Sequence, residues 1–145
     1  MNKNKAPIRR QSGFTLVEVM VVVIIIGLMV AAVAPVVLGR LDQAREERVK
    51  ADLRAIENAL TLYRVDNFAY PAGGEGLEAL IREPADARAW RGPYLEEMPQ
   101  DPWGNVYQYR KPGTRGGDYD LFSFGADGVE GGSGNNADLG NWTSD

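Results

Sequence analysis

An uncharged run of 21 residues, from Val19 to Gly39, is the feature that most constrains how this chain can fold. A helix of that length, at about 1.5 Å rise per residue, spans a bilayer hydrocarbon core of about 30 Å. The charged residues before Gly13 are all basic: Lys3, Lys5, Arg9 and Arg10. A positively charged flank stays in the cytoplasm. The sequence therefore predicts a single-pass membrane helix with a cytoplasmic N-terminus and its C-terminal side outside.

An ordinary secretory signal peptide fits this N-terminus poorly. Such peptides also begin with basic residues, but their apolar core is usually about 7 to 15 residues long and ends in an Ala-x-Ala-like cleavage site. Here the run is longer, and it continues past Pro35 toward Arg40. The small residue that stands out as a cleavage site is Gly13, which precedes the run.

Glu18 lies at the start of the predicted membrane helix. An unpaired carboxylate costs on the order of 3 kcal/mol at the bilayer centre, and the cost falls close to the interface. Two interpretations follow: the side chain reaches the lipid headgroups, or it pairs with a cation from another chain. The best candidate for that cation is the α-amino group that cleavage after Gly13 would create.

The segment 9–18, RRQSGFTLVE, resembles the processing signal of type IV pilins and type II secretion pseudopilins. In that family a prepilin peptidase cuts after the glycine and N-methylates the following phenylalanine, and the glutamate guides docking of subunits. The resemblance implies cleavage after Gly13, an N-methylated Phe14 and a docking role for Glu18. It also implies three segments: a cytoplasmic leader 1–13, a transmembrane and polymerisation helix 14–39, and a periplasmic domain 40–145.

Cysteine and histidine are both absent from the 145 residues. The chain therefore lacks Ser-His and Cys-His pairs for nucleophilic catalysis and the usual zinc ligands. Four of the 16 basic residues precede Gly13, which leaves 12 basic against 20 acidic residues in the remainder. Such an acidic body argues against nucleic-acid binding, which needs clustered Lys and Arg. We therefore expect neither an enzyme nor a nucleic-acid-binding protein.

An apolar stripe extends the predicted helix beyond the membrane run. Its residues recur at spacings of four, three, four and three: Val49, Leu53, Ile56, Leu60 and Tyr63. This spacing is typical of one face of an amphipathic helix, which we expect to pack on the chain's own C-terminal domain. Pro35 lies within the long pattern and removes one backbone hydrogen bond, so we expect a kink or a loosened turn there.

The last third of the chain predicts a small antiparallel sheet. The runs 106–109 and 119–123 alternate in polarity, and the glycine-rich segment 112–117 between them is typical of a hairpin turn. Upstream, 76–82 predicts a short amphipathic helix that ends before Pro84. Four aromatic residues are expected in the core or on the hairpin face: Trp103, Tyr107, Tyr109 and Tyr119. The predicted fold class is α+β, a long N-terminal helix packed on a small C-terminal antiparallel β-sheet.

Motifs in the C-terminal part narrow the resemblance. DPWG at 101–104, YDL at 119–121 and GNW at 140–142 look like those of the major pseudopilins of type II secretion systems. The likeness implies a pilin-like fold and a subunit that polymerises with copies of itself. Such a filament grows from the inner membrane as a periplasmic pseudopilus and drives export of folded proteins across the outer membrane. Minor pseudopilins and the inner-membrane assembly platform would be further partners.

The glycine-rich segment between 125 and 140 is the most plausible chemical site. Its centre, 129–136, offers few apolar contacts against the loss of backbone entropy, and oxygen ligands around calcium would offset that loss. Asp127 and Asp138 are the charged candidates, although their spacing does not fit an EF-hand. From the residues alone, a mobile surface loop is the more frequent interpretation. The resemblance implies a calcium ion held by the following groups: Asp127, Asp138, the carbonyls of Leu121 and Val129, and oxygens of Ser123.

Two other functions remain open at this point. A type IV pilin subunit shares the N-terminal signal, although many such pilins carry a C-terminal cysteine pair that this chain lacks. A membrane-anchored periplasmic calcium-binding protein or enzyme would share the anchor and the loop.

Overall fold

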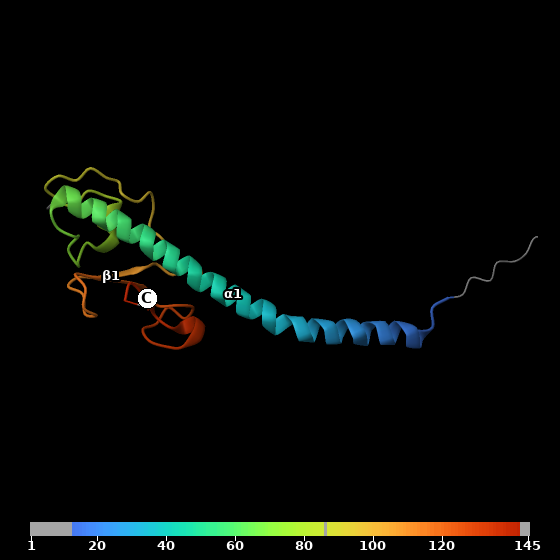
Figure 1. The fold of residues 1–145 in the computed structure, drawn as a ribbon. Helices are drawn as coiled ribbons and strands as arrows, with labels where there is room; N and C mark the ends of the chain where they lie inside the picture. The colour runs from blue at the N-terminus through green and yellow to red at the C-terminus, as the bar shows by residue number, and fades with distance from the viewer. Residues whose placement is uncertain (1–12, 86, 143–145) are drawn as a thin grey trace, which may run out of the picture. The chain divides into compact units, whose positions relative to one another are not determined.

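A computed structural model describes residues 13–85 and 87–142. The predicted leader 1–13 therefore lies, except for Gly13, outside the described residues. The chain divides into two compact units, 1–40 and 41–145. Helix α1, Leu16–Asn67, begins in the first unit and ends in the second (Figure 1). The other elements all belong to the second unit: 3-10 helices η1, Gly76–Leu80, and η2, Gly134–Asn136, and strands β1, Gln108–Arg110, β2, Asp120–Ser123, and β3, Leu139–Gly140.

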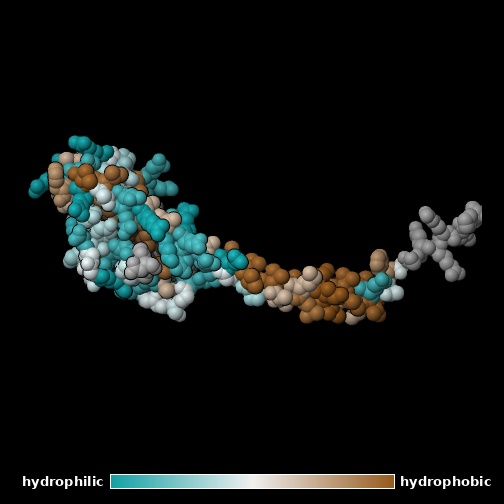
Figure 2. All heavy atoms as spheres, viewed as in Figure 1, coloured by the Kyte–Doolittle hydropathy of each residue, from teal (hydrophilic) through white to brown (hydrophobic). Residues whose placement is uncertain are grey.

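The first unit consists of the apolar part of α1. Every residue from Val19 to Gly39 is exposed, and Figure 2 shows this stretch as hydrophobic surface. Among the described residues, α1 is the helix that is long and apolar enough to cross a membrane. The helical assignment continues through Pro35 without a break. The expected kink or loosened turn at this proline stays a prediction.

The core of the second unit forms on one face of α1. All five residues of the predicted apolar stripe are buried: Val49, Leu53, Ile56, Leu60 and Tyr63. They pack against Leu77, Ala79 and Leu80 of η1 and against Tyr107, Tyr119 and Leu121 of the sheet region. The amphipathic pattern therefore predicted the core correctly. Burial of these side chains stabilises the fold, because each Å² of apolar area removed from water contributes roughly 25 cal/mol to its stability.

The sheet has three antiparallel strands in the order β1-β2-β3. Tyr109 pairs with Leu121, and Ser123 pairs with Leu139. The predicted hairpin is confirmed, but β1 begins at Gln108, two residues later than expected, and β3 was not predicted. Tyr107 and Tyr119 are buried, while Trp103 and Tyr109 pack half-buried against the core, as expected of the aromatic residues.

A buried carboxylate closes the hairpin turn. Asp120 accepts hydrogen bonds from the backbone N–H of Thr114 at 2.8 Å and from its hydroxyl at 2.6 Å. Burial opposes ionisation of Asp120, but these bonds outweigh it and hold the pKa of the carboxyl below its ordinary value. The turn is therefore fixed by side-chain chemistry as well as by glycine.

Candidate functional site

Gly13 and Phe14 precede α1 and are exposed. Apart from the two chain neighbours, a Cβ atom built on Gly13 would meet no described atom within 4 Å. Packing within those residues therefore gives no reason for a glycine at this position. The requirement for a small residue would instead have to come from a molecule that acts on the chain, as the cleavage prediction supposes.

Glu18 takes part in a capping box at the start of α1. The Glu18 N–H donates to the Thr15 hydroxyl at 3.2 Å, and the Thr15 N–H donates to Glu18 Oε2 at 3.4 Å. This reciprocal pair satisfies two backbone donors that a helix N-terminus otherwise leaves without partners. The Thr-x-x-Glu spacing of a capping box is present in the sequence, although the box was not among the predictions. Glu18 thus has a local role in addition to the predicted docking role.

The glycine-rich loop folds back on itself. The Ala126 N–H donates to the Asn135 carbonyl at 2.8 Å. This bond joins the beginning of the loop, its first arm, to the end of the loop, its second arm. The Val129 N–H donates to Asp127 Oδ1 at 3.2 Å. Across the loop, the Gly131 N–H lies 3.1 Å from each carboxylate oxygen of Asp138. Asp127 and Asp138 therefore both belong to one closed loop, in which Asp127 is exposed and Asp138 half-buried.

Of the other three predicted ligands, Val129 lies within the loop and is exposed, whereas Leu121 and Ser123 precede the loop. Leu121 and Ser123 are residues of β2, and both are buried. The Leu121 carbonyl accepts a hydrogen bond from the Asn141 N–H at 2.9 Å. The Ser123 hydroxyl donates to Asp101 Oδ2 at 2.5 Å and accepts from the Gly125 N–H at 3.0 Å. These bonds use part of the oxygen capacity of both residues, and their role as ligands stays a prediction.

The donor chemistry of the loop suits calcium. Its candidate groups are carboxylate, carbonyl and hydroxyl oxygens, the hard ligands that calcium prefers. A Cβ on Gly125 would lie 2.7 Å from the Asn135 carbonyl oxygen, and one on Gly132 would lie against the Asn136 carbonyl oxygen, so backbone oxygens crowd both glycines. Residues 13–85 and 87–142 contain no group of three or more His, Cys, Asp or Glu placed to hold a metal. Any ion would therefore depend on backbone oxygens beside the two aspartates.

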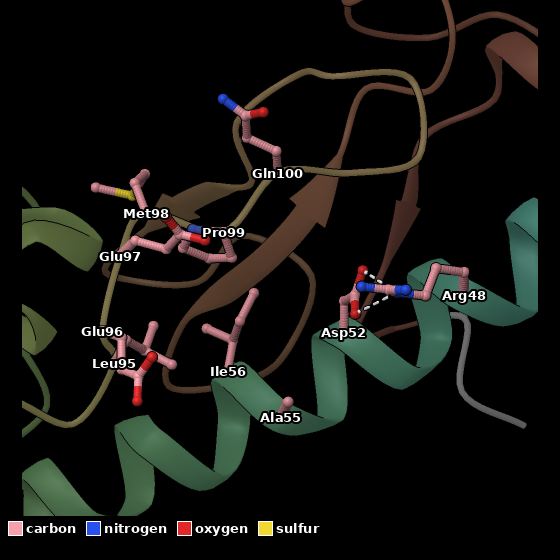
Figure 3. A pocket seen from close by; sticks show the side chains of 10 residues that line it. All are labelled: Arg48, Asp52, Ala55, Ile56, Leu95, Glu96, Glu97, Met98, Pro99 and Gln100. Atoms are coloured by element: carbon pink, nitrogen blue, oxygen red, sulfur yellow. Dashed lines mark hydrogen bonds and ion pairs between the residues drawn. The ribbon is translucent and has the colours of Figure 1, made fainter.

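A surface cavity of about 470 Å³ lies between α1 and the segment 95–100 (Figure 3). Its charged groups include Arg48, whose Nε donates to both carboxylate oxygens of Asp52 at 2.8 and 3.0 Å. The Tyr107 hydroxyl also donates to Asp52, at 3.2 Å. Burial, with the nearby Asp52 charge, raises the pKa of Tyr107 above its ordinary value, so this tyrosine remains a donor. The Asp52 carboxylate therefore accepts hydrogen bonds from both Arg48 and Tyr107, and the bond from Tyr107 connects the sheet region to α1.

The chain is similar to known proteins over most of its length. A family model described as type II secretion system protein G matches residues 36–142, and one described as the prokaryotic N-terminal methylation motif matches residues 8–34. A type II secretion system core protein G from Pseudomonas aeruginosa is 54% identical over 92% of this chain and 96% of its own. The corresponding protein from Vibrio cholerae is 49% identical over 92% of this chain and 93% of its own.

A solved structure shows the same likeness in three dimensions. The major pseudopilin from the type 2 secretion system of enterohaemorrhagic Escherichia coli superposes with a TM-score of 0.65 at 42% identity, over 73% of this chain and 93% of that one. The predicted fold class, a long N-terminal helix with a small antiparallel sheet, is confirmed by this match. The chain therefore belongs to the protein G family of type II secretion systems.

Proposed function

We propose that this chain is the major structural subunit of a type II secretion pseudopilus. The observation that carries the proposal is the joint match of residues 8–34 to a methylation motif and of 36–142 to protein G, on a chain in which the apolar stretch 19–39 of α1 is wholly exposed. An exposed apolar helix needs lipid or other helices around it. Polymerisation with copies of the same chain supplies those helices. The filament then pushes folded proteins across the outer membrane.

In this proposal each N-terminal residue has a task. A prepilin peptidase cuts after Gly13 and methylates Phe14, and Glu18 of one subunit pairs with the new amino group of another. The subunit waits in the inner membrane with residues 40–145 in the periplasm, and an assembly platform and minor pseudopilins act with it. The chain carries out no catalysis itself. The match to protein G favours this function over a type IV pilin.

Complementation tests the proposed function. Expressed in a Pseudomonas aeruginosa strain that lacks its own core protein G, this chain is expected to restore export, measured as the extracellular fraction of a secreted protein. The same strain carrying an empty vector is the control. Filaments without restored export would contradict the secretion function. Restoration of surface pili in a strain lacking its type IV pilin would favour the pilin alternative.

We further propose that the loop 125–138 binds calcium through Asp127 and Asp138. The carbonyls of Leu121 and Val129 and an oxygen of Ser123 would complete the set. Calcium at a free concentration of 100 times its dissociation constant stabilises the folded state by about 2.7 kcal/mol. For a domain of this size that corresponds to a rise in Tm of roughly 10 °C. The loop would then gain, from the ion, order that its own apolar contacts cannot supply.

Thermal unfolding of the full chain in detergent micelles checks the calcium proposal. The rise in Tm between chelator and added calcium is expected for the unchanged chain and should disappear in Asp138→Ala. Glu130→Ala, a change of an exposed acid in the same loop that is not a predicted ligand, is the matched control and should keep the rise. An unchanged chain whose Tm ignores calcium would refute the site.

A further inference from the structure

Asp101 is a buried acid outside the predicted ligand set, with an exposed fraction of 5%. We infer that it is a positioning residue, which sets the calcium affinity of the loop 125–138 by holding the entrance of that loop in place. The inference rests on the proposed calcium site and adds to it a residue that touches no ion. In the sequence, Asp101 stood out only as the first residue of the DPWG motif, which gave it no role.

Gly125, the first residue of the loop, is held from two sides. Its N–H donates to the Ser123 hydroxyl at 3.0 Å, and its carbonyl accepts from Asn105 Nδ2 at 2.8 Å. Both of these partners are bound to the same carboxylate. The Ser123 hydroxyl donates to Asp101 Oδ2 at 2.5 Å, and the Asn105 N–H donates to Asp101 Oδ1 at 2.8 Å. We call these four residues, Asp101, Asn105, Ser123 and Gly125, the Gly125 clamp.

The position of Gly125 decides where the two arms of the loop meet. Gly125 has a φ of +74°, which is left-handed, and the space beside its Cα is taken by carbonyl oxygens of Asn135 and Ala137. The next residue, Ala126, donates its N–H to the Asn135 carbonyl. Asp127 lies two residues after Gly125 on the first arm, and Asp138 lies three residues after Asn135 on the second arm. The clamp therefore fixes the position of Asp127 relative to Asp138.

Pre-organisation of the loop explains why the Gly125 clamp affects the affinity for calcium. An ion that binds a disordered loop must offset the entropy lost by each residue that becomes ordered, roughly 1 to 2 kcal/mol per residue for the backbone. A loop whose arms are already joined has less entropy left to lose, so more of the interaction energy appears as affinity. The Asp101 carboxylate is well suited to this role, because hydrogen bonds to a charged acceptor are stronger than those between neutral groups.

Asp120 provides a matched control for Asp101. It is also a buried aspartate, 2% exposed, and it also fixes a turn through backbone and hydroxyl donors, but its partners belong to the hairpin 114–120. The variants Asp101→Asn and Asp120→Asn are compared with the unchanged full chain in detergent micelles. Two quantities are measured: the dissociation constant for calcium by titration, and the rate of amide hydrogen exchange at residues 125–138 in chelator.

We expect Asp101→Asn to raise the calcium dissociation constant at least tenfold and to speed loop exchange in chelator, and Asp120→Asn to change neither. If Asp101→Asn does not fold, Asn105→Ala, which removes the grip on the Gly125 carbonyl, must give the same two results. An unchanged dissociation constant in these variants overturns the inference and leaves the calcium site standing. No calcium binding by the unchanged chain overturns both.

Discussion

Replacement of Gly13 by leucine is expected to leave essentially all of the chain with its leader attached. A Cβ at this position meets no described atom within 4 Å, so the change should not disturb the fold. The block would arise in the peptidase, whose active site must admit the residue before the cut. Intact-mass measurement of the membrane-extracted chain checks this, because the processed form begins at Phe14 and is shorter by 13 residues.

Gly27 offers a matched control for this substitution. A Cβ atom built on Gly27 would likewise meet nothing within 4 Å apart from its chain neighbours and the helix's own backbone, and Gly27 lies within the exposed part of α1, far from the cleavage point. Gly27→Leu should be processed like the unchanged chain. A processed Gly13→Leu variant that begins at Phe14 would refute the assignment of the cleavage site.

Replacement of Glu18 by alanine is expected to abolish filaments while insertion into the membrane and processing continue. An unpaired carboxylate costs on the order of 3 kcal/mol at the bilayer centre and less near the start of the helix, where Glu18 lies, and a pair with a neighbour's amino group recovers that cost. Every 1.4 kcal/mol or so recovered changes the equilibrium about tenfold for each subunit that joins. Filaments sheared from the cells and counted by electron microscopy give the measurement, with membrane-bound subunit quantified in parallel.

Thr15→Ala separates the two roles of Glu18. The capping box has one side-chain acceptor on each residue: Thr15→Ala removes the bond that the Thr15 hydroxyl accepts, and Glu18→Ala removes the bond that the Glu18 carboxylate accepts, but only Glu18→Ala removes the charge. Pairing between subunits predicts filaments from Thr15→Ala and none from Glu18→Ala. Equal loss in both variants would assign the effect to the helix start, and normal filaments from Glu18→Ala would refute pairing altogether.

The sequence predicted those parts of the fold that depend on periodic burial. The stripe from Val49 to Tyr63 repeats over four helical turns, and a pattern of that length leaves little choice of structure or of buried face. The hairpin was found through its glycine-rich turn, because tight hairpin turns need left-handed backbone conformations that glycine adopts readily. The short helix at 76–82 was placed correctly, but it is a 3-10 helix, Gly76–Leu80. Five residues carry too little pattern to distinguish the two helix types.

The parts that escaped prediction depend on contacts between distant residues. Strand β3 has two residues, Leu139 and Gly140, and a pair of residues has no detectable alternation. Asp101 lies 22 positions from Ser123, and only the fold makes it a buried partner instead of a surface acid. The loop acids Asp127 and Asp138 were candidates from their residue type alone, but the full ligand set came from family likeness, because glycine-rich segments have no periodicity that would place their side chains.

The complete exposure of α1 from Val19 to Gly39 has an energetic consequence for growth of the proposed filament. Lipid tails are about as apolar as the side chains of a neighbouring helix, so a subunit that leaves the bilayer for a helical bundle gains almost nothing from the hydrophobic effect. The hydrophobic contribution to this exchange is therefore close to zero along the whole run. The balance between membrane and filament then rests on side-chain packing between helices and on polar groups such as Glu18, not on removal of apolar surface from water.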